Sequence, residues 1–297
     1  MKNQKFGVEI ELTGVTRENA AKLMAELFGT NEWDYVGGTY STYQATDQKG
    51  RKWKAMSDSS IKTCNEDHNK TLNEEYECEI VTPICEYEDI ELIQKVVRKL
   101  KANGAMANSS CGIHVHVDAK QYTARTLWNL VNIMYSKEDI LYKALGVKTN
   151  RAVNYCRKTD ERFKDRINAA KPTLMSEVER LWYGGESRRY SHYDSSRYHA
   201  LNLHSLWQGK GIEFRCFNGT AHAGKIKAYI QLCLAISHQA LTQNKASTKK
   251  TESTNERFTF RTWLLHLGLI GDEFETARKH LLNNLQGDSA YRYGRAA

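Results

Sequence analysis

Four short segments of the chain alternate apolar residues with acidic, histidine or arginine residues. Side chains alternate between the two faces of a β-strand, so residues two apart share a face and lie about 6.7 Å from each other. Each segment therefore predicts a strand with one apolar face, which can pack on helices, and one face that carries chemistry. The residues of the second face are Glu9 and Glu11, Glu77 and Glu79, His114, His116 and Asp118, and Glu213 and Arg215.

The acidic faces of these strands favour the binding of divalent cations. Crowded carboxylates repel one another unless a positive charge lies among them. Mg²⁺ and Mn²⁺ take oxygen ligands and an occasional imidazole, and an arginine on the same face can hold a phosphate. If the four strands share one sheet, the pattern predicts a cation and phosphate site. The same carboxylates could also serve a metal-dependent phosphodiesterase or nuclease, which is our second hypothesis. Taken singly, an E-x-E strand is more often a solvated face, and Glu213 and Arg215 are more often an ion pair.

The rest of the sequence predicts helices that can cover the apolar strand faces. In 86–103, for example, Ile90, Ile93, Val97 and Leu100 fall on one side of a helix. Strands and helices do not alternate regularly, so the fold class is mixed α+β and not a doubly wound parallel sheet. No dinucleotide-binding or P-loop motif occurs. We expect strands over 5–13, 33–45, 51–57, 76–82, 112–118, 197–205 and 210–217, and helices over 17–28, 86–103, 123–145, most of 150–183, 222–243, 258–267 and 272–284.

Charge is distributed unevenly along the 297 residues, whose net charge is +8. The first 118 residues carry 14 Lys and Arg against 19 Asp and Glu, a net charge of −5, and the remainder carries +13. No apolar run is long enough for a transmembrane helix. The seven cysteines form no disulfide framework, which favours reduced thiols and a cytoplasmic protein.

The basic stretch 148–197 has three interpretations. It holds 12 Lys and Arg against 7 Asp and Glu, with tyrosines between them. Such a pattern is found in single-stranded nucleic-acid binding, but nucleic acid is not the partner we favour. A solvated helix surface is the plainer interpretation, which we favour for 157–171. For the loop 184–198 we favour a basic wall that receives phosphate and carboxylate groups.

Two other chemistries use the cysteines. Cys111 lies shortly before His114, so it is a candidate nucleophile, although cysteine is commonly a small core residue. Cys111, His114 and His116 are also a candidate zinc site, but a second Cys/His pair is missing. We rank both below the Mg²⁺ interpretation.

Six motifs occur in an order that resembles the putative amidoligase family. That family belongs to the carboxylate–amine ligase superfamily, with glutamine synthetase and glutamate–cysteine ligase. The resemblance runs from about residue 6 to about residue 240. The motifs are GVEIEL (7–12), WKAMSDSSI (53–61), ECEIVTPI (77–84), CGIHVHVD (111–118), RYHALNL (197–203) and IEFRCFNGT (212–220).

The resemblance implies a curved, mainly antiparallel sheet of the glutamine synthetase/glutamate–cysteine ligase type, flanked by helices. The concave face would hold ATP and two or three Mg²⁺ or Mn²⁺ ions. The implied reaction joins a carboxylate to an amine through an acyl phosphate, and the acceptor is an amino acid, a peptide or a larger molecule. We expect one catalytic domain over 1–285, with a helical, basic insertion at about 123–196 and a flexible tail over 286–297.

The resemblance also assigns roles to individual residues. Arg215 would hold the transferred phosphoryl group, Arg197 would be a second phosphate or substrate contact, and His116 would meet an ATP phosphate. Asp58, Ser60 and Asn202 would contribute to the substrate end of the cleft. Ser59 stands where related ligases often have glycine, so this loop is expected to differ. The expected metal ligands are Glu9, Glu11, Glu77, Glu79, His114 and Glu213.

Overall fold

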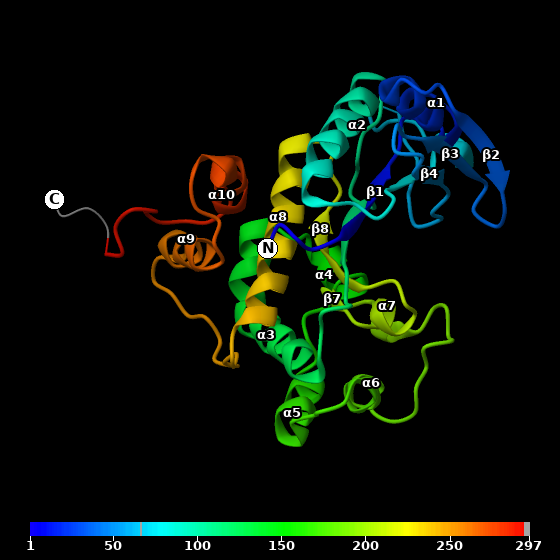
Figure 1. Cartoon of the computed structure of the whole chain (residues 1–297). Helices are drawn as coiled ribbons and strands as arrows, with labels where there is room; N and C mark the ends of the chain where they lie inside the picture. The colour runs from blue at the N-terminus through cyan, green and yellow to red at the C-terminus, as the bar shows by residue number, and fades with distance from the viewer. Residues whose placement is uncertain (66, 294–297) are drawn as a thin grey trace. The chain divides into compact units, whose positions relative to one another are not determined.

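A computed structural model describes residues 1–65 and 67–293 (Figure 1). These residues form a mixed α/β fold with one open, antiparallel sheet of eight strands in the order β2-β3-β4-β5-β1-β6-β8-β7. The predicted mixed class and antiparallel sheet are confirmed, while the likeness to glutamine synthetase stays a prediction. The four strands that carry the polar residues, β5, β1, β6 and β8, are consecutive. The strands are β1 Phe6–Leu12, β2 Trp33–Gly37, β3 Thr42–Thr46, β4 Lys52–Met56, β5 Cys78–Val81, β6 Gly112–Val117, β7 Leu201–Asn202 and β8 Ile212–Asn218.

The chain divides into two compact units. The sheet unit consists of Lys2–Val115 and Phe217–Ile230, and the helical unit of Met1, His116–Cys216 and the residues from Gln231 onward. The helices are α1 Arg17–Phe28, α2 Ile90–Ala102, α3 Ala124–Leu145, α4 Thr149–Asn154, α5 Glu161–Ala170, α6 Met175–Tyr183, α7 His204–Trp207, α8 Ala223–Thr242, α9 Glu256–His266 and α10 Glu275–Leu282.

The core of the sheet unit forms between its strands and the helices α1 and α2. Helix α1 contacts β3, β4, β5 and α2; in Figure 1 it lies at the upper right, near α2 and β3. It begins at Thr16, whose hydroxyl accepts a hydrogen bond from the Asn19 N–H at 3.2 Å, and it ends at Gly29 with φ +73°. At its last turn, the Phe28 ring lies 5.3 Å from that of Trp53 on β4. The predicted apolar face of β1 is buried, as is that of β5.

A charged network joins the β3–β4 turn to the start of α2. Asp47 and Gly50 form the turn, with a backbone hydrogen bond of 2.9 Å between them. The Arg51 guanidinium donates to Asp47 Oδ2 at 2.9 Å and to both carboxylate oxygens of Asp89 at 2.6 and 2.9 Å. This bidentate pair holds the turn against the residue that precedes α2.

The predicted strands 33–45 and 197–205 differ most from their sequence patterns. The segment 33–45 divides into β2 and β3, because Gly37, Gly38 and Ser41 all have positive φ and form a turn. The segment 197–205 keeps only the two residues of β7. There the Asn202 side chain accepts the His204 N–H at 2.9 Å, and this contact starts the short helix α7.

The helical unit is organised around α3, which contacts α5, α6, α9 and α10. The helix begins after Thr123, as predicted, and ends at Gly146 with φ +59°. The segment that follows α10 is held by Asn255, the residue before α9. The Asn255 side chain donates to the carbonyls of Tyr291 and Arg292 at 2.9 and 3.2 Å. The last part of the predicted tail, 294–297, lies outside the described residues. Among the described helices, none has both the length and the apolar character that crossing a membrane requires.

Candidate active site

His114 of β6 lies between the two glutamates of β1. Its Nδ1 is 3.0 Å from Glu9 Oε2, and its Nε2 is 3.4 Å from Glu11 Oε1. The two glutamates reach the same ring because they are two residues apart on one strand and therefore share a face. The structure thus brings together three of the predicted metal ligands.

Glu11 and Glu79 face each other across the sheet. They are direct partners in the antiparallel pairing of β1 and β5. Both are buried, with 3% and 8% of their surface exposed, so the solvated-face interpretation does not apply to them. The Gly112 N–H donates to Glu11 Oε2 at 2.6 Å. Two buried carboxylates that face each other destabilise the folded state unless positive charge compensates them.

Among the described residues of the sheet unit, two groups of side chains have the donor atoms that a cation needs. In each group the ligand atoms all lie within 4.8 Å of one another. The first group contains Glu9, Glu79 and His114, and the second contains Glu11, Asp58 and Glu79. Carboxylate oxygens with a single imidazole fit hard cations such as Mg²⁺ or Mn²⁺. Glu79 belongs to both groups and is the residue on which both depend.

Asp58 and Ser60 lie in the loop that follows β4. Asp58 Oδ1 accepts the Ser60 N–H at 2.8 Å and so closes a tight turn. The family resemblance predicts Asp58 at the substrate end of the cleft, and the structure places its carboxylate beside those of Glu11 and Glu79. A lone aspartate in a loop carries no period-two signal, so the alternation of strand residues could not have found it.

Glu77 takes a different position from Glu79. The predicted strand 76–82 begins only at Cys78, and Glu77 follows a short 3₁₀ turn, Glu74–Tyr76. Its carboxylate accepts the Ser57 hydroxyl at 2.7 Å, and its carbonyl accepts Arg17 Nη1 at 3.0 Å. Glu77 lies outside both donor groups of the sheet unit, so its role as a metal ligand stays a prediction.

Glu213 and Arg215 of β8 form a buried ion pair in the helical unit. They are 4% and 6% exposed, and Arg215 Nη1 donates to Glu213 Oε1. Asn202, the direct partner of Glu213 on β7, donates from Nδ2 to Glu213 Oε2 at 2.7 Å. Both oxygens of Glu213 are therefore oriented by neighbouring side chains. Asn202, predicted to bind substrate, holds Glu213 in this structure.

His116 and Arg197 are the remaining predicted phosphate contacts in the helical unit. His116 Nδ1 lies 3.3 Å from the Lys210 carbonyl and 3.4 Å from the Ser205 hydroxyl. Arg197 Nη1 donates to the His192 carbonyl at 3.4 Å, and its guanidinium lies over the rings of Tyr193 and Tyr198 at 5.8 and 5.7 Å. Arg197 is thus held by the loop that precedes it.

The buried cysteines Cys78, Cys85 and Cys111 lack the environment of a nucleophile. Burial raises the pKa of Cys78 to about 12 and that of Cys85 to about 11, so their thiolate forms are scarce at neutral pH. Cys111 is fully buried, and its thiol lies 3.6 Å from Asn108 Oδ1. None of the three-residue donor groups found in the described chain includes Cys111, so no zinc site with His114 and His116 is supported.

The two adjacent arginines of the basic loop each pair with a carboxylate. Arg188 Nε lies 2.6 Å from Asp194 Oδ2. Arg189 donates from Nε to Glu179 Oε1 at 2.8 Å, and its Nη2 pairs with the same carboxylate. These partners neutralise charges that a nucleic-acid-binding loop would present to the phosphate backbone.

Comparison with protein families identifies the family of this chain. A family model described as "Putative amidoligase enzyme" matches residues 2–237, which include both donor groups and the Glu213–Arg215 pair. A search among curated proteins finds no relative. The matched region covers well over half of the chain and agrees with the resemblance seen in the six sequence motifs.

Proposed function

The chain belongs to the putative amidoligase family, and on that premise we propose that it is an ATP- and Mg²⁺-dependent ligase that joins a carboxylate to an amine. The family match supports an enzyme of the ligase type. The observation that carries the finer proposal is the pair of donor groups that share the buried Glu79. Such a cluster suits a reaction in which polyphosphate must be held and its charge offset.

The residues of the two donor groups are the proposed cation ligands. Glu9, Glu79 and His114 would hold one divalent cation, and Glu11, Asp58 and Glu79 a second. When bound, such ions offset the charge of phosphate groups and help to align them. The paired contacts that orient Glu9, Glu11 and His114 in the structure reduce the reorganisation that ligand binding requires.

Arg215 is the residue we assign to the transferred phosphoryl group. Its guanidinium is planar, always charged and suited to bind two phosphate oxygens at once. The ion pair with Glu213 and the Asn202 contact to the same glutamate fix its direction. His116 and Arg197 are further contacts for phosphate, and Ser60 and Asp58 border the acid substrate.

The proposed reaction balances in two steps. A carboxylate oxygen of the acid attacks the γ-phosphorus of ATP, the bond to the leaving ADP breaks, and an acyl phosphate forms. The amine nitrogen then attacks the carbonyl carbon, the carbon–oxygen bond breaks, and inorganic phosphate leaves as the amine gives up a proton. Electrostatic stabilisation by Arg215 acts on the charge that develops during the first step.

ADP release tests this proposal directly. The full chain is incubated with ATP, Mg²⁺ and pools of amino acids, peptides and amines, and ADP is measured with and without each pool. We expect ADP that depends on Mg²⁺ and on both an acid and an amine. Glu79→Gln should abolish it, whereas Glu91→Gln, on the exposed side of α2, should leave it unchanged. Phosphodiester cleavage without ATP, lost in Glu79→Gln, would contradict the proposal and indicate a metal-dependent hydrolase.

A further inference from the structure

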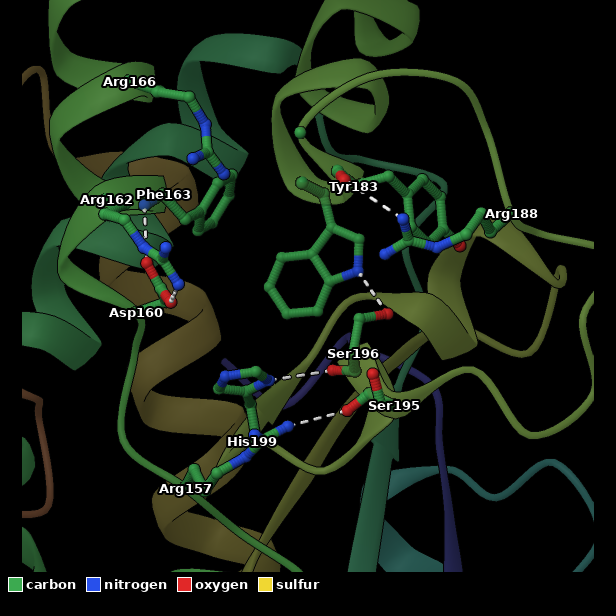
Figure 2. A pocket seen from close by; sticks show the side chains of 12 residues that line it. Arg157, Asp160, Arg162, Phe163, Arg166, Tyr183, Arg188, Ser195, Ser196 and His199 are labelled. Carbon is green, nitrogen blue, oxygen red and sulfur yellow. Dashed lines mark hydrogen bonds and ion pairs between the residues drawn. The ribbon is translucent and has the colours of Figure 1, made fainter.

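The helical unit contains a pocket that the proposed reaction does not use. It has a volume of about 350 Å³ and lies between α5, α6 and the segment before β7. In the view of Figure 2, Arg157, Arg162 and Arg166 lie along one side and Arg188 lies on the other, beside Tyr183. Three of these arginines belong to the stretch 157–171, which we had interpreted from the sequence as a solvated helix surface.

The four arginines are held in two different ways. Arg162 pairs with Asp160 at 3.3 Å, and Arg188 pairs with Asp194 at 2.6 Å. Arg157, by contrast, donates to the backbone carbonyls of Tyr198 and Ser195 at 3.3 and 2.8 Å. A carbonyl orients a guanidinium without cancelling its charge, so Arg157 keeps its positive charge at the pocket.

Arg166 is held in the same way as Arg157. Its Nη2 donates to the Leu181 carbonyl at 3.0 Å, a contact between α5 and the end of α6. A guanidinium has five N–H donors, and the hydrogen bonds to these carbonyls use two of them in Arg157 and one in Arg166. Two oriented positive charges with remaining donors therefore line one pocket.

An aromatic wall completes the pocket. Trp182 donates from Nε1 to the Ser196 hydroxyl at 3.1 Å. The rings of Phe163 and His199 meet it edge-on, at centroid distances of 5.1 and 5.6 Å. Burial lowers the pKa of His199 and the Arg157 charge lowers it further, which outweighs the opposite effect of the hydrogen bond with the Ser196 carbonyl. These contacts fix the plane of Trp182.

We propose that this pocket binds a small dianion with a flat apolar part, either a phosphate monoester or a dicarboxylate. Among the described residues, Arg157 and Arg166 donate to carbonyls and not to carboxylates. Together they match two negative charges in a pocket that the Asp160–Arg162 pair also lines, and the aromatic residues match a ring or a flat chain. The volume is at the lower end of the range for small-molecule sites. All the residues that carry this inference belong to the helical unit, and it does not rest on the proposed ligase function.

Calorimetric titration of the full chain, with EDTA and without ATP, tests the proposal. The probes are phenyl phosphate, phthalate and inorganic phosphate. We expect one molecule of phenyl phosphate or phthalate to bind per chain, more tightly than inorganic phosphate and less tightly at high salt. Tighter binding of phenyl phosphate would identify the preferred group as phosphate, and tighter binding of phthalate would identify it as carboxylate.

Three variants distinguish binding in the pocket from non-specific electrostatic attraction. Arg166→Gln should weaken binding about tenfold or more, whereas Arg180→Gln, an exposed arginine outside the pocket, should not change it. Trp182→Leu should weaken phenyl phosphate but not inorganic phosphate, and thermal unfolding verifies that each variant is folded. Absence of saturable binding up to about 10 mM, equal binding to Arg166→Gln, or binding of a single-stranded oligonucleotide alone would overturn the proposal.

Discussion

Glu11 of β1 and Glu79 of β5 are direct partners in an antiparallel pair, and both are buried. Carboxylates opposite each other on a sheet normally destabilise it. The arrangement is explained if the site exists to hold cations, because the ions would then offset the repulsion between the two carboxylates. This relationship links the register of two strands to the proposed chemistry, and it leads to the first prediction.

Glu11→Gln should separate stability from metal binding. Without Mg²⁺, the free energy of unfolding should stay the same or rise by about 1 kcal/mol, because one of two facing charges is gone. The amide oxygen can still accept the Gly112 N–H. Saturating Mg²⁺ should stabilise the wild type by about 2–3 kcal/mol and the variant by clearly less. Denaturant unfolding in the presence of Mg²⁺ or EDTA measures the stability and its increase on Mg²⁺ binding. Equal stabilisation of the wild type and Glu11→Gln by Mg²⁺ would contradict the role of Glu11 as a ligand.

Asn202 should contribute separately to folding and to activity. Its Oδ1 accepts the His204 N–H, and its Nδ2 donates to Glu213. Asn202→Ser can keep the first contact but cannot reach Glu213, so we expect near-normal stability and about tenfold lower ligase activity. Asn202→Ala should lose both contacts and about 1–2 kcal/mol of stability. Full activity in the serine variant would show that the Glu213 contact is unimportant.

Asp89 should make stability depend on acid pH. Burial raises its pKa, but the hydrogen bonds from Arg51 and the Glu86 N–H outweigh this and lower the pKa to about 2. Because the folded state then binds fewer protons than the unfolded one, this stabilisation is present above about pH 4 and is lost as the pH falls towards 2. Asp89→Asn should cost on the order of 1 kcal/mol at pH 7, after solvent screening.

The same comparison at lower pH completes this test. The difference in unfolding free energy between wild type and Asp89→Asn should shrink steadily from pH 4 to pH 2. Glu88→Gln, at the exposed neighbouring position, serves as the control and should show little difference from the wild type at any pH. If the difference in unfolding free energy between wild type and Asp89→Asn did not change with pH, the stabilisation by the Arg51 contact would not be electrostatic in origin.

Gly219 should be required for the position of β6. A Cβ atom at this residue would lie 2.4 Å from Cys111 Cβ and 2.8 Å from the Cys111 backbone, which immediately precedes Gly112 and the strand of His114. Gly219→Ala should therefore destabilise the protein by about 2 kcal/mol or more. Gly185→Ala, where no atom lies within 4 Å, should be close to neutral. Thermal unfolding of the two variants distinguishes a close approach from a general effect of replacing glycine.

The sequence predicted the strand faces of the site but not their register. The alternation of Glu9 and Glu11 with apolar residues follows from the period of a strand, and His114 follows from the same rule. Which residue of β5 faces Glu11 depends on long-range pairing, which a local pattern does not contain. For that reason Glu77 and Glu79 looked equivalent in the sequence, whereas only Glu79 faces Glu11.

Loops and neutralising partners were the least predictable features. Asp58 joins Glu11 and Glu79 only through the course of the loop after β4. The charges of Arg188 and Arg189 are offset by Asp194 and Glu179, whereas Arg157 and Arg166 contact carbonyls. A count of basic residues cannot distinguish these cases, because the distinction depends on tertiary contacts. Regular helices, such as α3 with its cap at Thr123, were predicted almost to the residue.

Mn²⁺ binding, followed by the loss of the free-ion electron paramagnetic resonance signal, tests the central claim most directly. Glu79 belongs to both donor groups, whereas Asp58 belongs to one. The wild type should bind Mn²⁺ saturably without nucleotide, Asp58→Asn should lose part of this binding, Glu79→Gln should lose most of it, and Glu91→Gln should bind as the wild type does. Wild-type Mn²⁺ binding by Glu79→Gln would contradict the account.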